Sequence, residues 1–166
     1  SRGVVGGGTK AGREGAMGAA GLDDVPLRAR LLTLDETLDA YPEVPAMLAT
    51  LKERGIATAI LSNGSPAMLH AAVKHAGLGD QLDAVLSVED VGVFKPHELV
   101  YNMVGARFGC AAEDVLFVSS NGWDAAGASG YGFTTVWVNR ATEPMDRLYA
   151  MPQHMLTDLT AIPDLI

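Results

Sequence analysis

With 166 residues, 48% of them hydrophobic, the chain is long enough to bury one substantial core and too apolar to remain disordered. Its net charge of −8 argues against nucleic acid or an anionic membrane as the principal partner. The single cysteine, Cys110, excludes an internal disulfide framework, and we find neither an apolar run of membrane-spanning length nor a secretory pattern. These properties predict an acidic globular domain of the reducing cytoplasm.

The first 40 residues differ from the remainder of the chain. Residues 1–21 (SRGVVGGGTKAGREGAMGAAG) are rich in glycine and have no hydrophobic period, so we expect them to be flexible or poorly packed. Residues 27–38 are compatible with one helix. We therefore divide the chain into a Gly-rich N-terminal segment, residues 1–40, and a core domain, residues 41–166.

From residue 43 onward, short apolar runs alternate with helical patterns. The apolar runs predict strands over residues 56–61, 83–88, 114–119 and 133–139. The helical patterns predict helices over residues 43–54, from Ser65 and Pro66 to Gly77, over 97–108 and after Gly122, with a last helical segment after Thr157. The expected stops of the first three helices are Gly55, Gly77 and Gly109.

This alternation predicts an α/β fold, a Rossmann-like parallel sheet flanked by helices. Ligands of such sheets bind beyond the carboxyl ends of the strands. Three polar clusters follow predicted strands: Ser62 with Asn63, Lys95 in a loop, and the stretch from Ser119 to Asp124. We expect the three clusters to converge on one crevice.

The first two clusters each allow two interpretations. Ser62, Asn63 and Gly64 are ordinary residues before a helix, but a hydroxyl beside the free amides of a helix N-terminus also suits a carboxylate or phosphate. Lys95, in "GVFKPHELVY", is either a surface lysine before a helix or a fixed ammonium. A fixed ammonium at this position would hold two carboxylates, or a substrate anion, in the crevice.

The third cluster, "SSNGWDAAGA" from Ser119 to Ala128, is unusual for a strand-to-helix turn. Its small residues allow the following helix to approach the sheet closely. Asp124 falls in the first turn of that helix, where the helix dipole favours a carboxylate anion. We expect Asp124 to pair with Lys95 and to have a functional role.

The other reactive side chains do not predict a site of their own. The histidines, His70, His75, His97 and His154, do not have the spacing of metal ligands. Cys110 has no basic neighbour in the sequence, so we interpret it as a small packed residue. We expect no metal and no cofactor.

The three clusters, with their order and spacing, resemble those of the haloacid dehalogenase superfamily, and of its L-2-haloacid dehalogenase branch in particular. The residues that carry the resemblance are "PEVPAMLATLKERGIATAILSNGS", "SVEDVGVFKPHELVY" and "LFVSSNGWDAAGASGYGFTTVWVNR", within residues 41–166. The resemblance implies a haloacid dehalogenase-like core, and it makes residues 1–40 a Gly-rich segment, unlike the family's cap helices, together with the remnant of a helical cap.

The resemblance also separates dehalogenation from phosphate hydrolysis. Phosphatases of the superfamily use Gly-Asp-x-x-x-Asp to hold Mg²⁺, and here Ser120 stands where the first of those acids would be, which leaves Asp124 alone. A phosphoryl group carries charge that a metal must offset, whereas displacement of halide by a carboxylate needs no metal. The resemblance therefore implies a metal-independent hydrolase that converts (S)-2-haloacids to (R)-2-hydroxyacids through an aspartyl ester.

By the same resemblance each cluster has a role. Ser62 with neighbouring amides would hold the substrate carboxylate, and Asn63 would help to accept the halide. Lys95 would orient the nucleophile, and Tyr101 matches an active-site tyrosine of the family. The remaining roles fall to the third cluster: Ser119 and Asn121 would fix Asp124, Asp124 would activate water, and Trp123 would wall the substrate pocket.

The nucleophile of the family is missing from this pattern. It is the Asp of Asp-x-Tyr-Gly-Thr at the end of a buried strand, and we find no such strand ahead of the core. Asp39, in "LDAYPEV", is a poor substitute, because Pro42 and Glu43 replace the Gly and Thr and no apolar strand precedes it. We therefore expect a fragment that is inactive or nearly so, with a lost central strand and an exposed sheet edge.

Two alternatives remain open at this point. One is a phosphatase of small phosphate esters, and the other is a non-catalytic module that binds a small carboxylate or a partner chain. Family members tend to be homodimers, so the resemblance also implies a homodimer, although the cap helices commonly involved are largely absent here. The expected partner is a small 2-haloacid.

Overall fold

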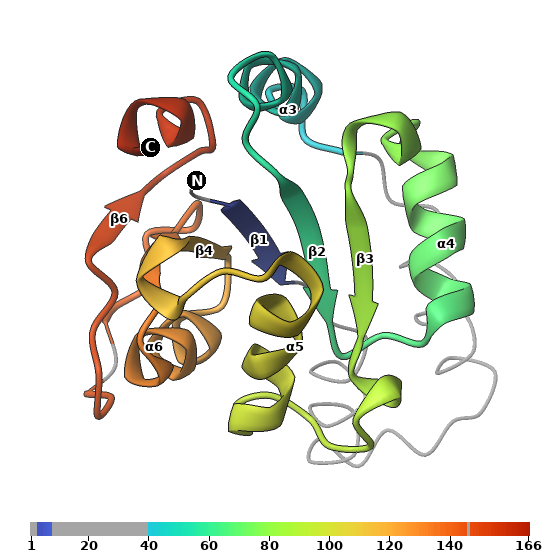
Figure 1. Cartoon of the computed structure of the whole chain (residues 1–166). Coiled ribbons are helices and arrows are strands. Elements are labelled where there is room, and N and C mark those ends of the chain that lie inside the picture. The colour runs from blue at the N-terminus through green and yellow to red at the C-terminus, as the bar shows by residue number, and fades with distance from the viewer. Residues whose placement is uncertain (1–2, 8–39, 146) are drawn as a thin grey trace, which may run out of the picture.

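The computed structural model describes residues 3–7, 40–145 and 147–166, and these form a six-stranded parallel sheet with helices on both faces (Figure 1). The strand order is β3-β2-β1-β4-β5-β6. The strands are β1 Gly3–Gly7, β2 Thr58–Ser62, β3 Ala84–Ser87, β4 Val115–Ser119, β5 Thr134–Val138 and β6 His154–Leu156. The α-helices are α3 Val44–Glu53, α4 Pro66–His75, α5 Glu98–Phe108 and α6 Gly122–Tyr131, and the 3-10 turns are η1 Gly79–Gln81, η2 Val88–Asp90, η3 Ala112–Asp114 and η4 Ile162–Leu165.

The predicted elements between residues 43 and 139 are confirmed, because local signals define their ends. Helix α4 begins as expected: Pro66 is its first residue, and the Ser65 hydroxyl accepts a hydrogen bond from the Met68 amide at 3.4 Å. Helix α5 ends at Gly109, whose φ of 63° is one that L side chains rarely adopt. The α/β fold class is confirmed with these elements.

Strand β1 corrects the prediction for the start of the chain. Gly3–Gly7 lies between β2 and β4, with Val5 beside Ala59 on one side and Phe117 on the other. A strand that is paired on both sides in the middle of the sheet contradicts the expected lost central strand, and it joins these five residues to strands of the predicted core domain. Strand pairing uses backbone N–H and C=O groups, which glycine has like other residues. A Gly-rich strand can therefore form without the side-chain pattern by which strands are predicted.

The other predictions for residues 1–40 fall largely outside the described part of the chain. The helix over residues 27–38 and the carboxylate of Asp39 both lie in the segment 8–39, which the structure does not describe. The interpretation of this segment as the remnant of a helical cap stays a prediction.

The end of the chain also differs from expectation. The helical segment after Thr157 is only the short turn η4, and the chain first forms a strand, β6, that pairs with β5. Strand β6 has three residues, too few to show an alternating pattern. The backbone of Thr160 then donates to the Asp158 carboxylate at 2.8 Å, a turn that competes with a longer helix.

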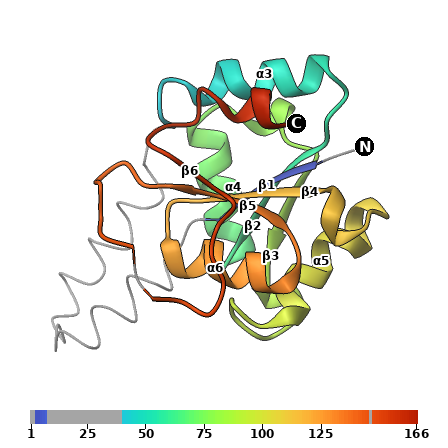
Figure 2. The ribbon, with the colours of Figure 1, turned by 90° about the vertical axis from the view of Figure 1, so that its left-hand side faces the viewer.

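Two apolar layers fix the helices against the sheet (Figure 2). Helices α5 and α6 pack on one face around Tyr101, Phe117 and Phe133, whereas α3 and η4 pack on the other face around Leu51 and Ile162. No helix within the described ranges is long and apolar enough to cross a membrane. The helices on both faces hold the strands in place, and the polar clusters follow the carboxyl ends of β2, β3 and β4.

Candidate active site

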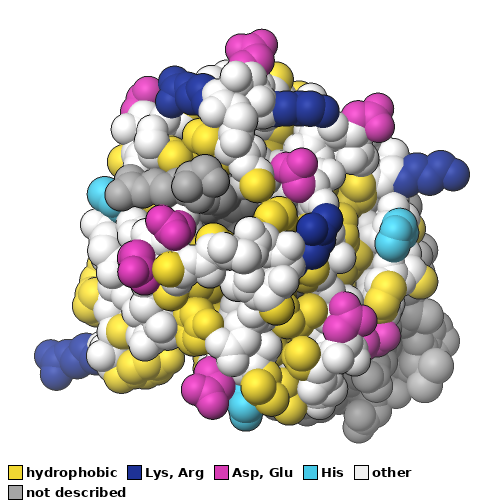
Figure 3. All heavy atoms as spheres, viewed as in Figure 1, with side chains coloured by type: hydrophobic (Ala, Val, Ile, Leu, Met, Phe, Trp, Pro, Cys, Tyr) yellow, Lys and Arg dark blue, Asp and Glu magenta, His cyan; other side chains and the backbone are white. Residues whose placement is uncertain are grey.

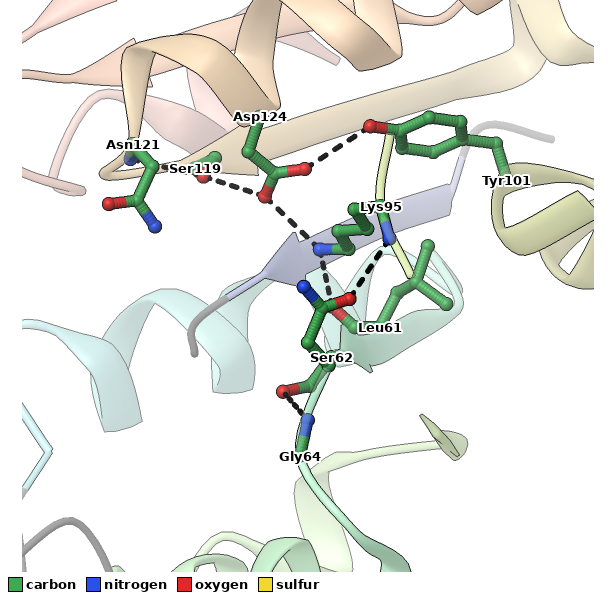
Figure 4. A network of polar contacts seen from close by, with 9 residues as sticks. Leu61, Ser62, Gly64, Lys95, Tyr101, Ser119, Asn121 and Asp124 are labelled. Carbon is green, nitrogen blue, oxygen red and sulfur yellow. Dashed lines mark hydrogen bonds and ion pairs between the residues drawn. The ribbon is translucent and has the colours of Figure 1, made fainter. Parts of the chain in front are cut away.

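A buried ion pair forms the centre of the site (Figure 4). The Lys95 ammonium donates to Asp124 Oδ2 at 3.1 Å and to the Leu61 carbonyl oxygen at 2.8 Å. Both side chains are fully buried. Lys95 comes from the loop between η2 and α5, and Asp124 from the first turn of α6. The predicted pairing of Lys95 with Asp124 is therefore confirmed, and it joins the end of β2 to the start of α6.

Two hydroxyl groups complete the surroundings of Asp124. The Ser119 hydroxyl, at the last residue of β4, donates to Asp124 Oδ2 at 3.0 Å. The Tyr101 hydroxyl, from α5, donates to Oδ1 at 3.3 Å. Three side-chain donors from the described residues thus meet at this buried carboxylate.

The burial of the site shifts the pKa values of two of its members. Burial lowers the pKa of Lys95, because the ammonium loses its hydration, and the nearby Asp124 carboxylate counteracts this shift. Burial raises the pKa of Tyr101 well above its usual value, and the negative charge of Asp124 raises it further. Tyr101 is therefore a protonated hydrogen-bond donor at neutral pH.

The loop after β2 lies against Lys95 from below in Figure 4. The Asn63 side-chain oxygen accepts a hydrogen bond from the Lys95 backbone amide at 3.1 Å. The buried Ser62 hydroxyl accepts one from the Gly64 amide at 3.1 Å, and the Ser87 hydroxyl donates to the Gly64 carbonyl at 2.7 Å. Sequence reasoning missed Ser87, although its place at the end of a predicted strand was a usable signal.

Asn121 and Trp123 lie farther from the ion pair than the sequence analysis expected. The Asn121 backbone amide donates to the Ser119 hydroxyl at 3.2 Å, and the Asn121 side chain points away from Asp124 in Figure 4. Trp123 is 39% exposed and lines a surface pocket together with Asn121 and Trp137. Neither Lys95 nor Asp124 lines that pocket. The structure therefore gathers Ser62, Asn63, Lys95, Tyr101, Ser119 and Asp124, and leaves Trp123 on an outer surface.

The acidic groups of the site are few. Ser120 is exposed, and its carbonyl oxygen accepts from the Trp137 indole at 3.2 Å. Within the described ranges, no three His, Cys, Asp or Glu side chains are close enough together to hold a metal ion. Strand β1 ends beside the site, with Gly7 in register with Ser119, and its sequence GVVGG contains no carboxylate.

Comparison with known proteins agrees with this geometry. The family model of haloacid dehalogenase-like hydrolases matches residues 9–132. The match begins well before residue 41, where the sequence analysis placed the start of the resemblance.

Individual relatives are similar over most of the chain. It is 43% identical over 146 residues to the (S)-2-haloacid dehalogenase of Pseudomonas sp. strain YL, a match that covers 87% of this chain and 63% of that enzyme. It is 39% identical over 145 residues to (S)-2-haloacid dehalogenase 1 of Pseudomonas sp. strain CBS-3, with 87% and 64% covered. The chain thus spans slightly less than two thirds of either relative.

A solved structure extends the agreement to three dimensions. The L-2-haloacid dehalogenase of Xanthobacter autotrophicus with chloropropionic acid covalently bound has a TM-score of 0.76 and 36% identity to this chain. The superposition covers 90% of this chain and 70% of that structure. Since the sequence, the fold and the family model all agree over most of its length, the chain belongs to the haloacid dehalogenase-like hydrolases.

Proposed function

We propose that this chain belongs to a hydrolase that converts (S)-2-haloacids to (R)-2-hydroxyacids. The observation that carries the proposal is the buried pair of Lys95 and Asp124, in which a single carboxylate is held by an ammonium and two hydroxyls. The names of the most similar relatives support the same reaction. A phosphatase is disfavoured, because Ser120 supplies no second carboxylate for a metal beside Asp124.

The proposed reaction has two covalent steps. A carboxylate oxygen attacks carbon 2 of the haloacid, the carbon–halogen bond breaks, and the halide leaves from an ester intermediate. Water then attacks the ester carbonyl, the ester bond breaks, and the hydroxyacid and the free carboxylate are released. In the second step Asp124 would accept the proton of the attacking water.

The other residues would bind and orient. Lys95 would offset the negative charges that meet at the carboxyl edge of the sheet, and Ser119 and Asn121 would hold Asp124 in place. Ser62 and the amides before α4 would hold the substrate carboxylate, while Asn63 would contact the leaving halide. Tyr101 would contribute through Asp124. Trp123 would act only from the outer surface, because neither Lys95 nor Asp124 lines the pocket that it forms.

Strand β1, with the sequence GVVGG, contains no carboxylate that could attack the substrate. By the resemblance the attacking carboxylate belongs at the end of a buried strand, and β1 ends there in glycine, with Gly7 beside Ser119. We therefore propose that the chain binds its ligand but releases halide very slowly or not at all. This observation also favours a second candidate function, a non-catalytic module that binds small 2-hydroxyacids or 2-haloacids.

Two assays test the proposal. In the first, the chain is titrated with (R)-lactate and followed by NMR; we expect saturable binding that Asn63→Ala weakens. In the second, chloride release from (S)-2-chloropropionate is measured for Gly7→Asp, with Gly3→Asp at the other end of β1 as the matched control. We expect release only from Gly7→Asp, and its loss when Asp124→Asn is added.

Each outcome decides between the candidates. Binding of (R)-lactate without chloride release from Gly7→Asp would favour the binding module. Neither binding of (R)-lactate nor chloride release from Gly7→Asp would reject both candidates. Hydrolysis of p-nitrophenyl phosphate that requires Mg²⁺ would instead favour a phosphatase. Chloride release by the unmodified chain, abolished by Asp124→Ala, would show that the predicted inactivity is wrong.

We further propose that the protein works in the cytoplasm on a small acid, not on nucleic acid, and that it forms a homodimer. The net charge of −8 and the lone Cys110 support the first two points. Figure 3 supports the second point, because the basic side chains on that face stand apart and do not form one patch, and acidic side chains are scattered over the same face. The homodimer rests only on the tendency of the family, and measurement of the molar mass in solution tests it.

A further inference from the structure

Gly127 occupies the point where three parts of the site come together. It is buried in α6, three residues after Asp124, so both lie on the same face of the helix. A Cβ atom at this position would lie 2.6 Å from the Tyr101 hydroxyl oxygen and 2.7 Å from Pro96 Cβ. Both distances are below the 3.0 Å that real Cβ atoms keep, so a side chain here would force its neighbours to move.

The two neighbours differ in their freedom to move: Tyr101 is fully buried, whereas Pro96 is exposed and is held through the backbone next to Lys95. The Tyr101 ring is fully buried and makes edge contacts with Phe117 and Phe133 at centroid distances of 5.9 and 5.8 Å. Pro96 follows Lys95 directly, and the Lys95 backbone amide is itself bonded to Asn63. A displacement at Gly127 would therefore reach the Tyr101 hydroxyl directly and the Lys95 ammonium through the backbone.

Local helix preference argues against a glycine at this position. Glycine costs about 0.8–1.0 kcal/mol relative to alanine inside a helix. The neighbours Ala126 and Ala128 show that α6 accepts alanine on either side. A glycine at 127 thus makes the helix less stable than an alanine would. It also allows the Tyr101 hydroxyl and Pro96 to lie close to the backbone of α6.

We propose that Gly127 is a positioning residue, whose missing side chain lets Tyr101 and Lys95 reach the Asp124 carboxylate together. Its effect on turnover rests on the proposed function, whereas its effect on the Tyr101–Asp124 hydrogen bond does not. Gly130, in the same helix, supplies a matched control. The atoms nearest to a Cβ there belong to Tyr149, at 2.5 Å and beyond, and that side chain is 75% exposed and can turn away.

The first test follows the hydrogen bond itself. The ¹³Cζ resonance of Tyr101, assigned by its loss in Tyr101→Phe, reports whether the hydroxyl donates to a carboxylate. We expect Gly127→Ala to shift this resonance towards that of a solvated tyrosine, and Gly130→Ala to leave it unchanged. An unshifted Tyr101 resonance in folded Gly127→Ala would overturn the proposal.

The second test uses rescue and covers the case in which Gly127→Ala folds poorly. Urea unfolding is measured for Gly127→Ala in the wild-type and Tyr101→Phe backgrounds, since Tyr101→Phe removes the nearest clashing atom. We expect the loss in midpoint to be clearly smaller in the Tyr101→Phe background. An equal loss in both backgrounds, or failure to fold in both, would mean that Gly127 does not accommodate the Tyr101 hydroxyl.

The third test joins the inference to catalysis. In the Gly7→Asp background we expect Gly127→Ala to lower kcat for chloride release about 100-fold, with a smaller change in KM, and Gly130→Ala to change neither. Full turnover by Gly127→Ala would overturn the positioning role. If Gly7→Asp itself releases no chloride, the proposed catalytic function fails, and the resonance and rescue experiments still decide the structural inference.

Discussion

At the scale of single residues, Asp124 shows how a buried carboxylate is surrounded by hydrogen-bond donors. Lys95 supplies a full positive charge, while Ser119 and Tyr101 supply hydroxyl donors, all from different elements of the fold. A buried charge without such partners would cost several kcal/mol. The four side chains are therefore interdependent, and substitution of one should change how much the others contribute to stability.

Replacement of Lys95 tests this interdependence. We expect Lys95→Met to destabilise the fold by about 3–5 kcal/mol, because it leaves Asp124 as a buried anion without its cation. Adding Asp124→Asn removes the stranded charge, so the double variant should regain part of the loss. Urea unfolding followed by circular dichroism measures both. A double variant less stable than Lys95→Met alone would show that the stranded charge is not the cause.

At the scale of elements, glycines mark where helices stop and where they approach one another. Helix α5 ends at Gly109 in the left-handed region, and α6 uses Gly127 for close packing. The stops at Gly55, Gly77 and Gly109 were all predictable, because a left-handed residue after a hydrophobic period is a local signal. The packing role of Gly127 was not, because it depends on atoms of Tyr101 and Pro96.

The stop of α5 gives a prediction at this scale. We expect Gly109→Ala to lower the free energy of unfolding by about 1–2 kcal/mol, since its φ of 63° is strained for alanine. Gly79→Ala is the control, because the new Cβ would meet only Val73, at an ordinary 4.0 Å. Urea midpoints of the two variants make the comparison. Equal midpoints would contradict the claim that backbone strain at Gly109 sets the difference.

At the scale of the whole molecule, one cluster joins segments that are distant in the sequence. The Glu43 carboxylate, at the start of α3, accepts from the Arg140 guanidinium after β5 and from the Leu159 amide at 3.4 Å. The Arg140 guanidinium also stacks 3.6 Å from the centre of the Tyr41 ring. This cluster ties the entry into α3 to the C-terminal segment that follows β6.

The acidity of Glu43 makes this cluster dependent on pH. The hydrogen bond from Arg140 is the main cause that holds the pKa of Glu43 below its ordinary value of 4.5. Its stabilisation should therefore be present above pH 4.5 and lost as the pH falls through the lowered pKa. We expect Glu43→Gln to cost at most about 1 kcal/mol at pH 7, because the pair is partly exposed.

Urea unfolding at pH 7 and pH 3 measures the dependence. The difference in unfolding free energy between wild type and Glu43→Gln should be smaller at pH 3 than at pH 7. The control, Glu113→Gln, changes an exposed position and should show no such change. A larger difference in unfolding free energy at pH 3 than at pH 7 would contradict the expected pH dependence.

How much of the site could be predicted from the sequence differs from residue to residue. Lys95, Asp124 and Ser119 were found because they follow strands whose carboxyl ends must meet at one edge of a parallel sheet. The hydrogen bond from Tyr101 to Asp124 was not predicted, because it depends on how α5 lies against α6. Trp123 was expected at the crevice, and only the packed helix shows it on an outer surface.

The sequence by itself determined the alternation of strands and helices from residue 43 to 139, their ends and the polar clusters, because these depend on local periodicity and on glycine and proline. Only the tertiary structure decided the central place of β1, the pairing of β6 with β5 and the close approach at Gly127. A short strand of glycine and valine has no local sequence pattern strong enough to predict it. Its position is decided by the two neighbouring strands, β2 and β4, which pair with its backbone.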